Sequence, residues 1–281
     1  MSVTTPSIAN ETDLIFLREL ILTRSAIVLE PEKDYLIQSR LEPVAKEAGL
    51  NSLEELAQAL RTTPSGPLHE KVVEAMTTNE TSFFRDVHPF EAFRDSVMPD
   101  MLKKRADTRR LSIWCGASSS GQEPYTIAMI LREHFPELAT WDIKFVATDI
   151  STQMLEKCRE GKYSQLEVNR GMPAQLLMKY FEKKGMSWRV KDELRNMVEF
   201  RQLNLAGSWP PMAKVDIIWL RNVLIYFDVE MKKEILQKIR HLMQPDGYLF
   251  LGGAESTMNL DDHFQRLNFN ATSCYRLGNH T

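Results

Sequence analysis

Asp149 is the first residue whose type and position suggest ligand binding. It lies near the end of the apolar segment Val146–Ile150, which has the composition of a buried strand. A carboxylate at the end of a strand can accept hydrogen bonds from both hydroxyls of a ribose. Aspartate also favours helix N-caps, but Ser151 is equally able to cap the helix that follows. We therefore interpret Asp149 as a nucleoside ligand.

A second candidate region is the segment 114–121, which is rich in small residues and leads into a predicted helix. Small residues let a backbone approach a ligand closely, but a tight strand–helix turn also needs them, so both interpretations stay open. The helix opens with Glu123 and Pro124. A glutamate would repel phosphate and a proline removes an N–H donor, so this end suits a cationic group. A ribose, an ammonium and no phosphate describe S-adenosylmethionine rather than a dinucleotide.

Two further apolar segments end in polar residues. Asn204 precedes Leu205 and Arg221 precedes Asn222, each where a strand would meet a loop. An asparagine and an arginine in such positions can contact an adenine edge or a carboxylate.

The densest polar cluster is the segment 77–86, Thr-Thr-Asn-Glu-Thr-Ser-Phe-Phe-Arg-Asp. It could be a helix-to-helix connection with capping residues, and with Phe83 and Phe84 in the core. One connection rarely needs so many hydrogen-bonding groups beside two aromatic rings and Arg85. We therefore favour a functional role for this linker.

These candidates fall on a strand–helix alternation that begins after residue 110. The predicted strands are 111–115, 143–147, 215–220 and 248–251, and the predicted helices are 124–135, 151–160 and 229–243. The alternation predicts an α/β fold, a parallel sheet covered by helices on both faces, with ligands at the carboxyl ends of its strands. Residues 264–269 and 272–277 are expected to form an antiparallel edge hairpin.

Two other regions differ from this pattern. Residues 161–205 interrupt it with a predicted helix, 173–183, and a hairpin of 188–190 with 197–203, so we interpret them as an inserted β-subdomain.

The residues before 77 form a small helical unit. Asn51 and Glu54 have the spacing of a capping box for its third helix. Pro43 predicts a kink or a start in its second helix.

The composition of the 281 residues is that of a globular protein, with 43% hydrophobic and 26% charged residues. The net charge of −3 disfavours nucleic acid as a partner. No apolar run reaches the ~18 residues of a membrane span, and Met1–Pro6 has no signal-peptide character. Three separated cysteines and six histidines without ligand spacing predict no metal and a reducing cytoplasm.

Five segments together resemble the motif set of the CheR family of chemotaxis receptor methyltransferases. In chain order they are Thr77–Asp86, Trp114–Tyr125, Ala147–Ile150, Arg221–Asp228 and Pro245–Gly247. The resemblance extends from about Asp13 to Leu277, and its blocks Asn-x-Thr-x-Phe-Phe-Arg and Arg-Asn-x-x-Ile-Tyr-Phe are long and specific.

The resemblance implies an all-α N-terminal domain, 1–76, a linker, 77–90, and a Rossmann-like methyltransferase domain, 91–281, with the β-subdomain at about 161–205. It implies transfer of a methyl group from S-adenosylmethionine to glutamate side chains on the cytoplasmic helices of chemoreceptors. S-adenosylhomocysteine would be the product. The expected protein is a cytoplasmic monomer, recruited to receptor arrays without inserting into the membrane.

The resemblance also implies site residues. The residues expected to bind the cofactor are Asn79, Thr81, Arg85, Ala117, Glu123, Asp149, Asn204, Leu205, Arg221 and Asn222, with Glu123 near the methionine amino group and Asp149 on the ribose. Tyr226 matches a tyrosine close to the reacting methyl. Because glutamate is ionised at neutral pH, no general base is required. Arg85 and Tyr226 are expected to orient the substrate carboxylate.

Two alternatives remain: a methyltransferase of the same fold with another substrate, and a cofactor-binding signalling module without catalysis. One departure from relatives concerns the second helix, which is strongly basic in them but carries Glu42 and Glu47 beside Arg40 and Lys46 here. Relatives that bind a receptor's C-terminal tail have a longer, Gly-containing loop in the β-subdomain than 181–188. We therefore expect no tail tether.

Overall fold

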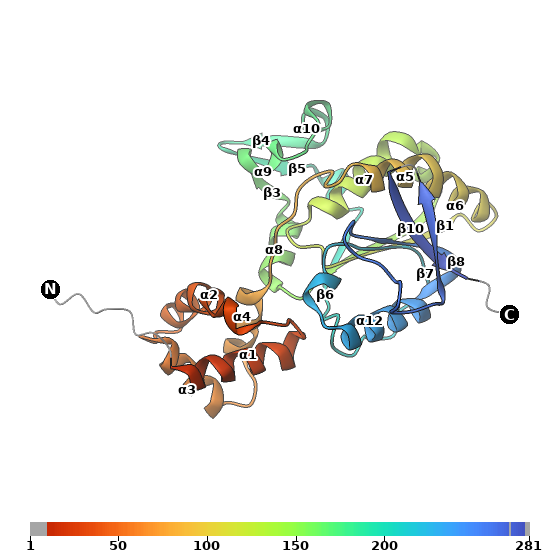
Figure 1. Ribbon diagram of the computed structural model, residues 1–281. Coiled ribbons are helices and arrows are strands. Elements are labelled where there is room, and N and C mark those ends of the chain that lie inside the picture. The colour runs from red at the N-terminus through yellow and green to blue at the C-terminus, as the bar shows by residue number, and fades with distance from the viewer. Residues whose placement is uncertain (1–9, 270, 279–281) are drawn as a thin grey trace. The chain divides into compact units, whose positions relative to one another are not determined.

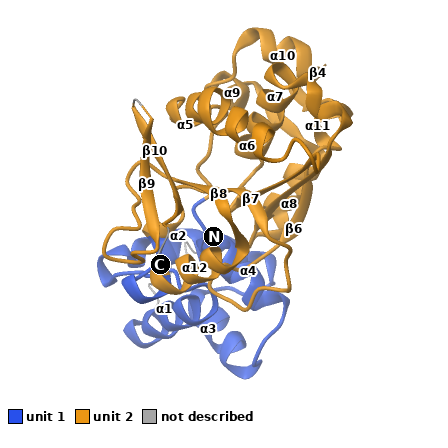
Figure 2. Cartoon of the chain, turned by 90° about the vertical axis from the view of Figure 1, so that its right-hand side faces the viewer, with its two compact units in different colours: residues 1–78, 226–231 blue, residues 79–225, 232–281 orange. Residues whose placement is uncertain are grey.

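The computed structural model describes residues 10–269 and 271–278. Met1–Pro6, on which the signal-peptide prediction rests, lies outside them. The chain forms two compact units (Figure 2). The first comprises the residues up to Thr78 together with Tyr226–Met231, and the second comprises Asn79–Ile225 and Lys232–Thr281.

The first unit is helical. Its elements are α1 (Glu11–Ser25), a short 3₁₀ helix η1 (Pro31–Lys33), α2 (Asp34–Glu47), α3 (Leu53–Thr62) and α4 (Pro67–Met76). Apolar residues at helical spacing, such as Leu17 and Ile21 of α1 and Ile37 and Leu41 of α2, are fully buried between the helices.

The expected N-cap of α3 is wrong, and so is the helix start, one of the two outcomes expected at Pro43. The N-cap of α3 is Ser52, whose hydroxyl accepts from the Glu55 N–H, while the Glu55 carboxylate accepts from the N–H of Asn51. The cap lies one residue later than expected because Leu53 must face the core. Pro43 neither starts nor ends a helix, since α2 continues through it. Buried residues on both sides of the proline favour the uninterrupted helix despite its missing N–H.

The second unit contains a seven-stranded main sheet (Figure 1). Its strands, in spatial order, are β6 (Glu199–Gln202), β2 (Asp142–Asp149), β1 (Arg110–Gly116), β7 (Val215–Leu220), β8 (Met243–Leu251), β10 (Thr272–Leu277) and β9 (Phe264–Phe269). The first five are parallel, and β10 and β9 form the expected antiparallel hairpin. Because the strands run the same way, the residues that follow β1, β2 and β7 meet at one edge of the sheet.

Helices lie on both faces of this sheet. They are α5 (His88–Ala92), a π-helical turn η2 (Phe93–Val97), α6 (Met98–Lys104), α7 (Gln122–His134), a 3₁₀ helix η3 (Pro136–Thr140), α8 (Thr152–Glu160) and α12 (Val229–Leu242). In Figure 1, α5, α6 and α7 lie on the opposite side of the sheet from α12. Between the helices and the sheet, Trp219 stacks on Phe250 at 4.2 Å and on Phe90 at 5.1 Å between ring centroids. No helix in the described part of the chain is long and apolar enough to cross a membrane.

The inserted region differs from its prediction. It contains β3 (Lys162–Ser164), α9 (Gln165–Asn169), α10 (Ala174–Tyr180), β4 (Phe181–Lys184), β5 (Ser187–Val190) and α11 (Asp192–Arg195). The hairpin joins β4 to β5, and a three-stranded sheet has the order β3-β5-β4.

The predicted hairpin of 188–190 with 197–203 is therefore wrong. Residues 199–202 form β6, which pairs with β2 in the main sheet. The predicted helix 173–183 also ends early, at Tyr180. The rings of Tyr163 and Phe181 lie in contact with that of Phe83, and this packing favours a strand after the helix.

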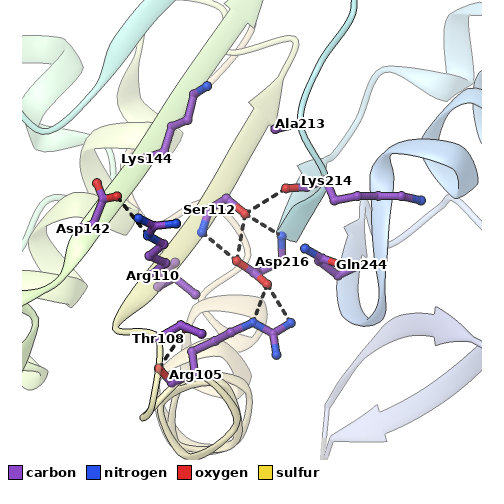
Figure 3. A pocket seen from close by; sticks show the side chains of 11 residues that line it. Arg105, Thr108, Arg110, Ser112, Asp142, Lys144, Ala213, Lys214, Asp216 and Gln244 are labelled. Atoms are coloured by element: carbon purple, nitrogen blue, oxygen red, sulfur yellow. Dashed lines mark hydrogen bonds and ion pairs between the residues drawn. The ribbon is translucent and has the colours of Figure 1, made fainter.

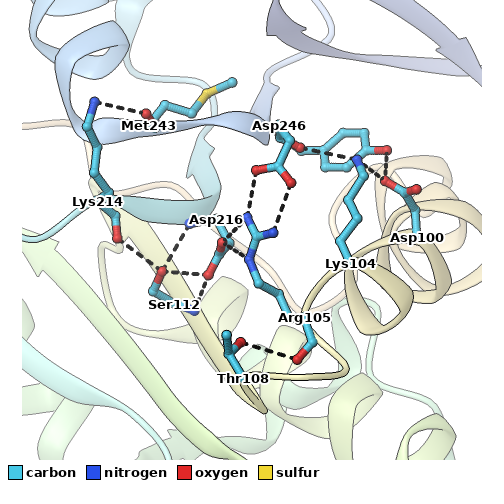
Figure 4. A network of polar contacts seen from close by, with 10 residues as sticks. Asp100, Lys104, Arg105, Thr108, Ser112, Lys214, Asp216, Met243 and Asp246 are labelled. Carbon is cyan, nitrogen blue, oxygen red and sulfur yellow. Dashed lines mark hydrogen bonds and ion pairs between the residues drawn. The ribbon is translucent and has the colours of Figure 1, made fainter.

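A polar network closes the amino edge of the main sheet (Figure 4). Arg105, which caps α6, donates two hydrogen bonds to Asp246, at 2.6 and 2.9 Å, and one to Asp216 at 2.8 Å. Asp216 also accepts from the N–H of Ser112 at 2.7 Å. The turn containing Asp246 thus links α6 to β7 and β8.

A cavity of about 440 Å³ lies beside this network, at the opposite edge from the candidate residues (Figure 3). Two of the cations that line it already have partners. Arg110 lies 3.6 Å from Asp142, and the Lys214 ammonium donates to the Met243 carbonyl.

Candidate functional site

The loop after β1 has an unusual backbone. Ala117 and Ser119 both have positive φ, 54° and 49°. Such conformations cost about 1–3 kcal/mol in non-glycine residues and persist where the surroundings impose them. Here the N–H of Ser118 donates to the carbonyl of Thr148, which fixes the loop against the end of β2.

Asp149 is buried at the end of β2 and joins two loops. One carboxylate oxygen accepts from the N–H of Ser119 at 2.7 Å, and the other accepts from the N–H of Ser151 at 2.9 Å. The N-cap of α8 is Ser151, whose hydroxyl accepts from the Met154 N–H. The helix cap is therefore Ser151, and the Asp149 carboxylate is held at the mouth of the β1 loop.

The linker contacts the same loop. The carbonyl of Asn79 accepts from the Ser119 hydroxyl at 2.9 Å, and the N–H of Phe84 donates to the Thr126 hydroxyl at 3.2 Å. Phe83 is fully buried, whereas Thr81 and Arg85 are half-buried. The linker is thus anchored by its backbone and by Phe83, which leaves polar side chains at its surface.

Arg221, the first residue after β7, is the centre of the polar contacts, with a side chain only 1% exposed. Its guanidinium donates to Glu123 at 2.6 Å, to Asp86 at 2.9 Å and to the carbonyl of Arg85 at 3.2 Å. The pairing offsets the cost of burying the cation. Its Nε is buried and finds no hydrogen-bond partner among the described residues.

Glu123 therefore has a partner that its position in the sequence did not indicate. It lies in the first turn of α7, as expected, but it faces the Arg221 guanidinium. The thiol of Cys115 lies 3.5 Å from its other oxygen. Burial, and then the Glu123 charge, raise the pKa of this thiol well above its ordinary value, which disfavours a nucleophilic thiolate.

The remaining predicted residues are placed differently. Asn204 and Leu205 follow β6; the Asn204 side chain accepts from the N–H of Ala206, and Leu205 is buried. Asn222 follows Arg221 and has a φ of 58°. Tyr226 ends the 3₁₀ helix η4 (Leu224–Tyr226) and belongs to the first unit, where its carbonyl accepts from the N–H of Val28. Arg85 belongs to the second unit.

Two residues at the carboxyl edge of the main sheet are not among the candidates named individually from the sequence. Asp86 was included only as part of the polar linker, although it binds Arg221. Glu255 follows β8 and accepts from the backbone around Asn222. A polar residue after an apolar strand was the signal that identified Asp149, and the same signal would have identified Glu255.

Two domain models of one protein family match this chain, one over its N-terminal part and one over the rest. Residues 79–272 match the CheR methyltransferase, SAM binding domain, and residues 12–77 match the CheR methyltransferase, all-alpha domain. Together they define a methyltransferase that uses S-adenosylmethionine. The chain belongs to the CheR methyltransferase family, as the motif resemblance indicated.

Curated relatives agree with this membership. "Chemotaxis protein methyltransferase Cher2" of Pseudomonas putida is 44% identical over 85% of this chain and 88% of its own length. "Chemotaxis protein methyltransferase 1" of Pseudomonas aeruginosa is 42% identical over 95% of this chain and 98% of its own length. The solved glycopeptide N-methyltransferase MtfA with sinefungin has 11% identity and a TM-score of 0.37, over 63% of this chain and 52% of its own, too low to carry an argument. The chain is a methyltransferase of chemotaxis with S-adenosylmethionine as its cofactor.

The residues at the carboxyl edge fit this cofactor by charge. Asp86, Glu123, Asp149 and Glu255 carry four negative charges, and Arg85 and Arg221 carry two positive ones, which leaves a net charge of −2. S-adenosylmethionine carries a sulfonium, an ammonium and a carboxylate, hence a net charge of +1. The unpartnered Arg221 Nε is a donor that a carboxylate could satisfy.

Proposed function

We propose that this chain methylates glutamate side chains on the cytoplasmic helices of chemoreceptors, forming γ-carboxyl methyl esters. The observation that supports the proposal best concerns two arginines at the carboxyl edge. Arg221 is paired with two carboxylates, whereas Arg85 is paired with none among the described residues. This difference bears on the substrate because a carboxylate needs a cation that the protein has not already neutralised.

Arg221 is neutralised by Asp86 and Glu123. Arg85, whose carbonyl touches Arg221, donates only to the carbonyl of Glu80, at 2.9 Å, and has no carboxylate partner among the described residues. Its remaining N–H donors match a carboxylate in the two-pronged geometry typical of arginine. We assign Arg85 to the orientation of the substrate glutamate.

The reaction requires the protein mainly to position the methyl donor and the glutamate carboxylate. S-adenosylmethionine, when bound, supplies an activated methyl group on a sulfonium. A glutamate side chain is ionised at neutral pH, so no residue has to remove a proton. Arg85 would hold the carboxylate and exclude water from it, and Tyr226 would donate one hydrogen bond to it. These bonds must stay weak enough not to favour the ground state over the less charged transition state.

The cofactor-binding residues follow from the same proposal. Asp149 would accept the ribose hydroxyls, and Glu123, beside Arg221, would face the methionine ammonium. Asn79, Thr81 and Ala117 would form the rest of that wall, and Asn204, Leu205 and Asn222 would form the adenine side. The proposal places the enzyme in the cytoplasm, where the receptor helices lie, as a monomer.

Methyl transfer to a panel of receptor signalling domains tests the proposal. With labelled cofactor, the product should release its label in mild alkali, as a carboxyl ester does and an N-methyl group does not. Arg85→Ala should lower the rate at least ~100-fold, because about 3 kcal/mol of carboxylate positioning is lost. Arg85→Lys should recover part of it, since a lysine keeps the charge but not the paired donors.

The control is Arg94→Ala, which removes a half-buried arginine paired with its neighbour Asp95. It should leave the rate within a few fold. Alkali-stable label would show that the substrate is not a carboxylate. A near-parental rate in Arg85→Ala would assign the orientation of the substrate to another residue.

A further inference from the structure

Glu255 makes an unusual set of hydrogen bonds at the carboxyl edge of the main sheet. One of its carboxylate oxygens accepts from the N–H groups of Val223 at 2.8 Å and Leu224 at 2.7 Å. The other accepts from the N–H groups of Asn222 at 2.7 Å and Gly252 at 2.6 Å. Three successive N–H groups of the loop after β7 therefore converge on one buried carboxylate.

The loop after β7 needs such an anchor. It leaves the strand at Arg221 and turns sharply at Asn222, whose positive φ is disfavoured for a non-glycine residue. Its N–H groups point inward and find no ladder partner, so they require an acceptor. A carboxylate satisfies several N–H groups at once, with charge-assisted bonds that are stronger than neutral ones.

The contact of Glu255 with the loop leaves no room for a side chain at Gly252. A Cβ at Gly252 would lie 2.7 Å from the Glu255 carboxylate, 2.8 Å from the Asn222 backbone nitrogen and 2.8 Å from its side-chain nitrogen. A methyl group there would separate the acceptor from its donors. The next residue, Gly253, has nothing within 4 Å of the same position. The requirement for glycine is therefore confined to the residue that touches the loop.

We propose that Glu255 is a positioning residue, which fixes the loop Arg221–Leu224 in the conformation that binds the cofactor. The inference rests on the proposed function in one respect, the assignment of Arg221 and Asn222 to the cofactor pocket. Glu255 acts through the loop backbone and does not itself touch the reacting atoms. Removing its charge should loosen this loop while the rest of the sheet stays folded.

Glu255→Gln is the sharpest variant because it keeps the shape of the side chain. Its amide nitrogen would face backbone N–H groups, so two of the four donors would lose their acceptor. We expect the Kd for S-adenosylhomocysteine, measured by calorimetry, to rise about tenfold or more, and the amides of residues 222–224 to exchange with deuterium faster than in the parent. The KM for cofactor should rise while the KM for receptor stays unchanged.

Asp216→Asn is the matched control. Asp216 is a buried carboxylate that accepts a backbone N–H at the other end of β7, and its loss should lower the melting temperature. The Kd for S-adenosylhomocysteine should nevertheless stay within about twofold of the parent, since the loop is untouched. This variant separates a general loss of stability from a loss of loop conformation.

Gly252→Ala and Gly253→Ala form a second pair that changes no charge. The first should weaken S-adenosylhomocysteine binding and increase exchange at 222–224, and the second should do neither. Unchanged binding in both folded Glu255→Gln and folded Gly252→Ala would overturn the inference. So would an equal rise in Kd in Asp216→Asn. Because the binding and exchange measurements need no receptor, a parent enzyme that binds the cofactor but methylates no receptor would refute the proposed function alone.

Discussion

At the scale of single residues, the site places opposite charges around one buried guanidinium, that of Arg221. Arg221 faces two carboxylates, and Asp149 accepts two backbone N–H groups. A carboxylate held in this way keeps its orientation before a ligand arrives, which lowers the ordering cost of binding. Because of these contacts, replacing Arg221 or Asp149 would also remove a hydrogen-bond partner from the neighbouring residues.

Asp149 offers the first residue-scale prediction. Asp149→Ala should weaken binding of S-adenosylhomocysteine by about 3 kcal/mol, or more than ~100-fold, since two bonds to a charged acceptor are lost. Calorimetry measures this directly. Asp149→Asn keeps the size of the side chain and should show most of the loss.

Ser151→Ala is the control for this experiment, because it removes the cap of α8 but leaves the Asp149 carboxylate in place. It should lower stability by about 1 kcal/mol with little change in affinity. Unaltered affinity in both Asp149 variants would remove this residue from the cofactor site.

At the scale of elements, the amino edge of the sheet depends on the bonds of Arg105. They join α6 to the start of β7 and to the turn within β8. The hydrogen bond from Arg105 lowers the pKa of the Asp246 carboxyl below its ordinary value of 3.8. A carboxyl group with a lowered pKa in the folded state stabilises the fold above that ordinary value, and this contribution is lost as the pH falls through the folded-state pKa.

Asp246→Asn should therefore lower the melting temperature by a few degrees near neutral pH. The difference from the parent should shrink as the pH is lowered from about 6 to about 3, because a protonated aspartate resembles asparagine. Thermal unfolding followed by circular dichroism over this range checks both parts. A difference that is constant with pH would mean that the ion pair with Arg105 contributes nothing.

At the scale of the whole molecule, the question is how a receptor is held. Arg40 of α2 donates to the carbonyls of Met76 and Thr77, so it fixes the end of α4. Beside Glu42 and Glu47, this leaves Lys46 as the other cation of α2. Electrostatic attraction through this helix should be weak.

A tail tether is the other way to hold a receptor, and we expect this enzyme to work without one. Gly185 and Met186 alone connect β4 to β5, so the β-subdomain has little spare backbone with which to hold a peptide. Deleting the last residues of the receptor should leave the initial methylation rate, at receptor concentrations below KM, within a few fold.

Binding of an isolated receptor tail peptide is the decisive counter-test. Measurable affinity that disappears in Gly185 or Trp188 variants would show that a tether exists. A peptide that does not bind, together with a large loss of rate on tail deletion, would point to an effect of the tail on the receptor itself.

The sequence alone determined the elements whose signals are local. The apolar runs predicted β7 and the edge hairpin β9–β10 with their observed bounds, and the choice of Ser151 over Asp149 as helix cap is confirmed. These features depend on side-chain periodicity and capping within a few residues, which a single sequence displays. The motif resemblance likewise identified the family, because long blocks of specific residues rarely match by chance.

Tertiary structure decided which of these residues meet. The pair of Glu123 with Arg221 joins residues 98 apart, and the bonds of Glu255 to the loop after β7 join residues 31 to 33 apart. The placement of β6 beside β2, rather than in a hairpin with β5, also depends on strand pairing between distant segments. A local pattern shows that a side chain is polar or that a strand is apolar. Only packing of the sheet selects the partner, since many pairings satisfy the same pattern.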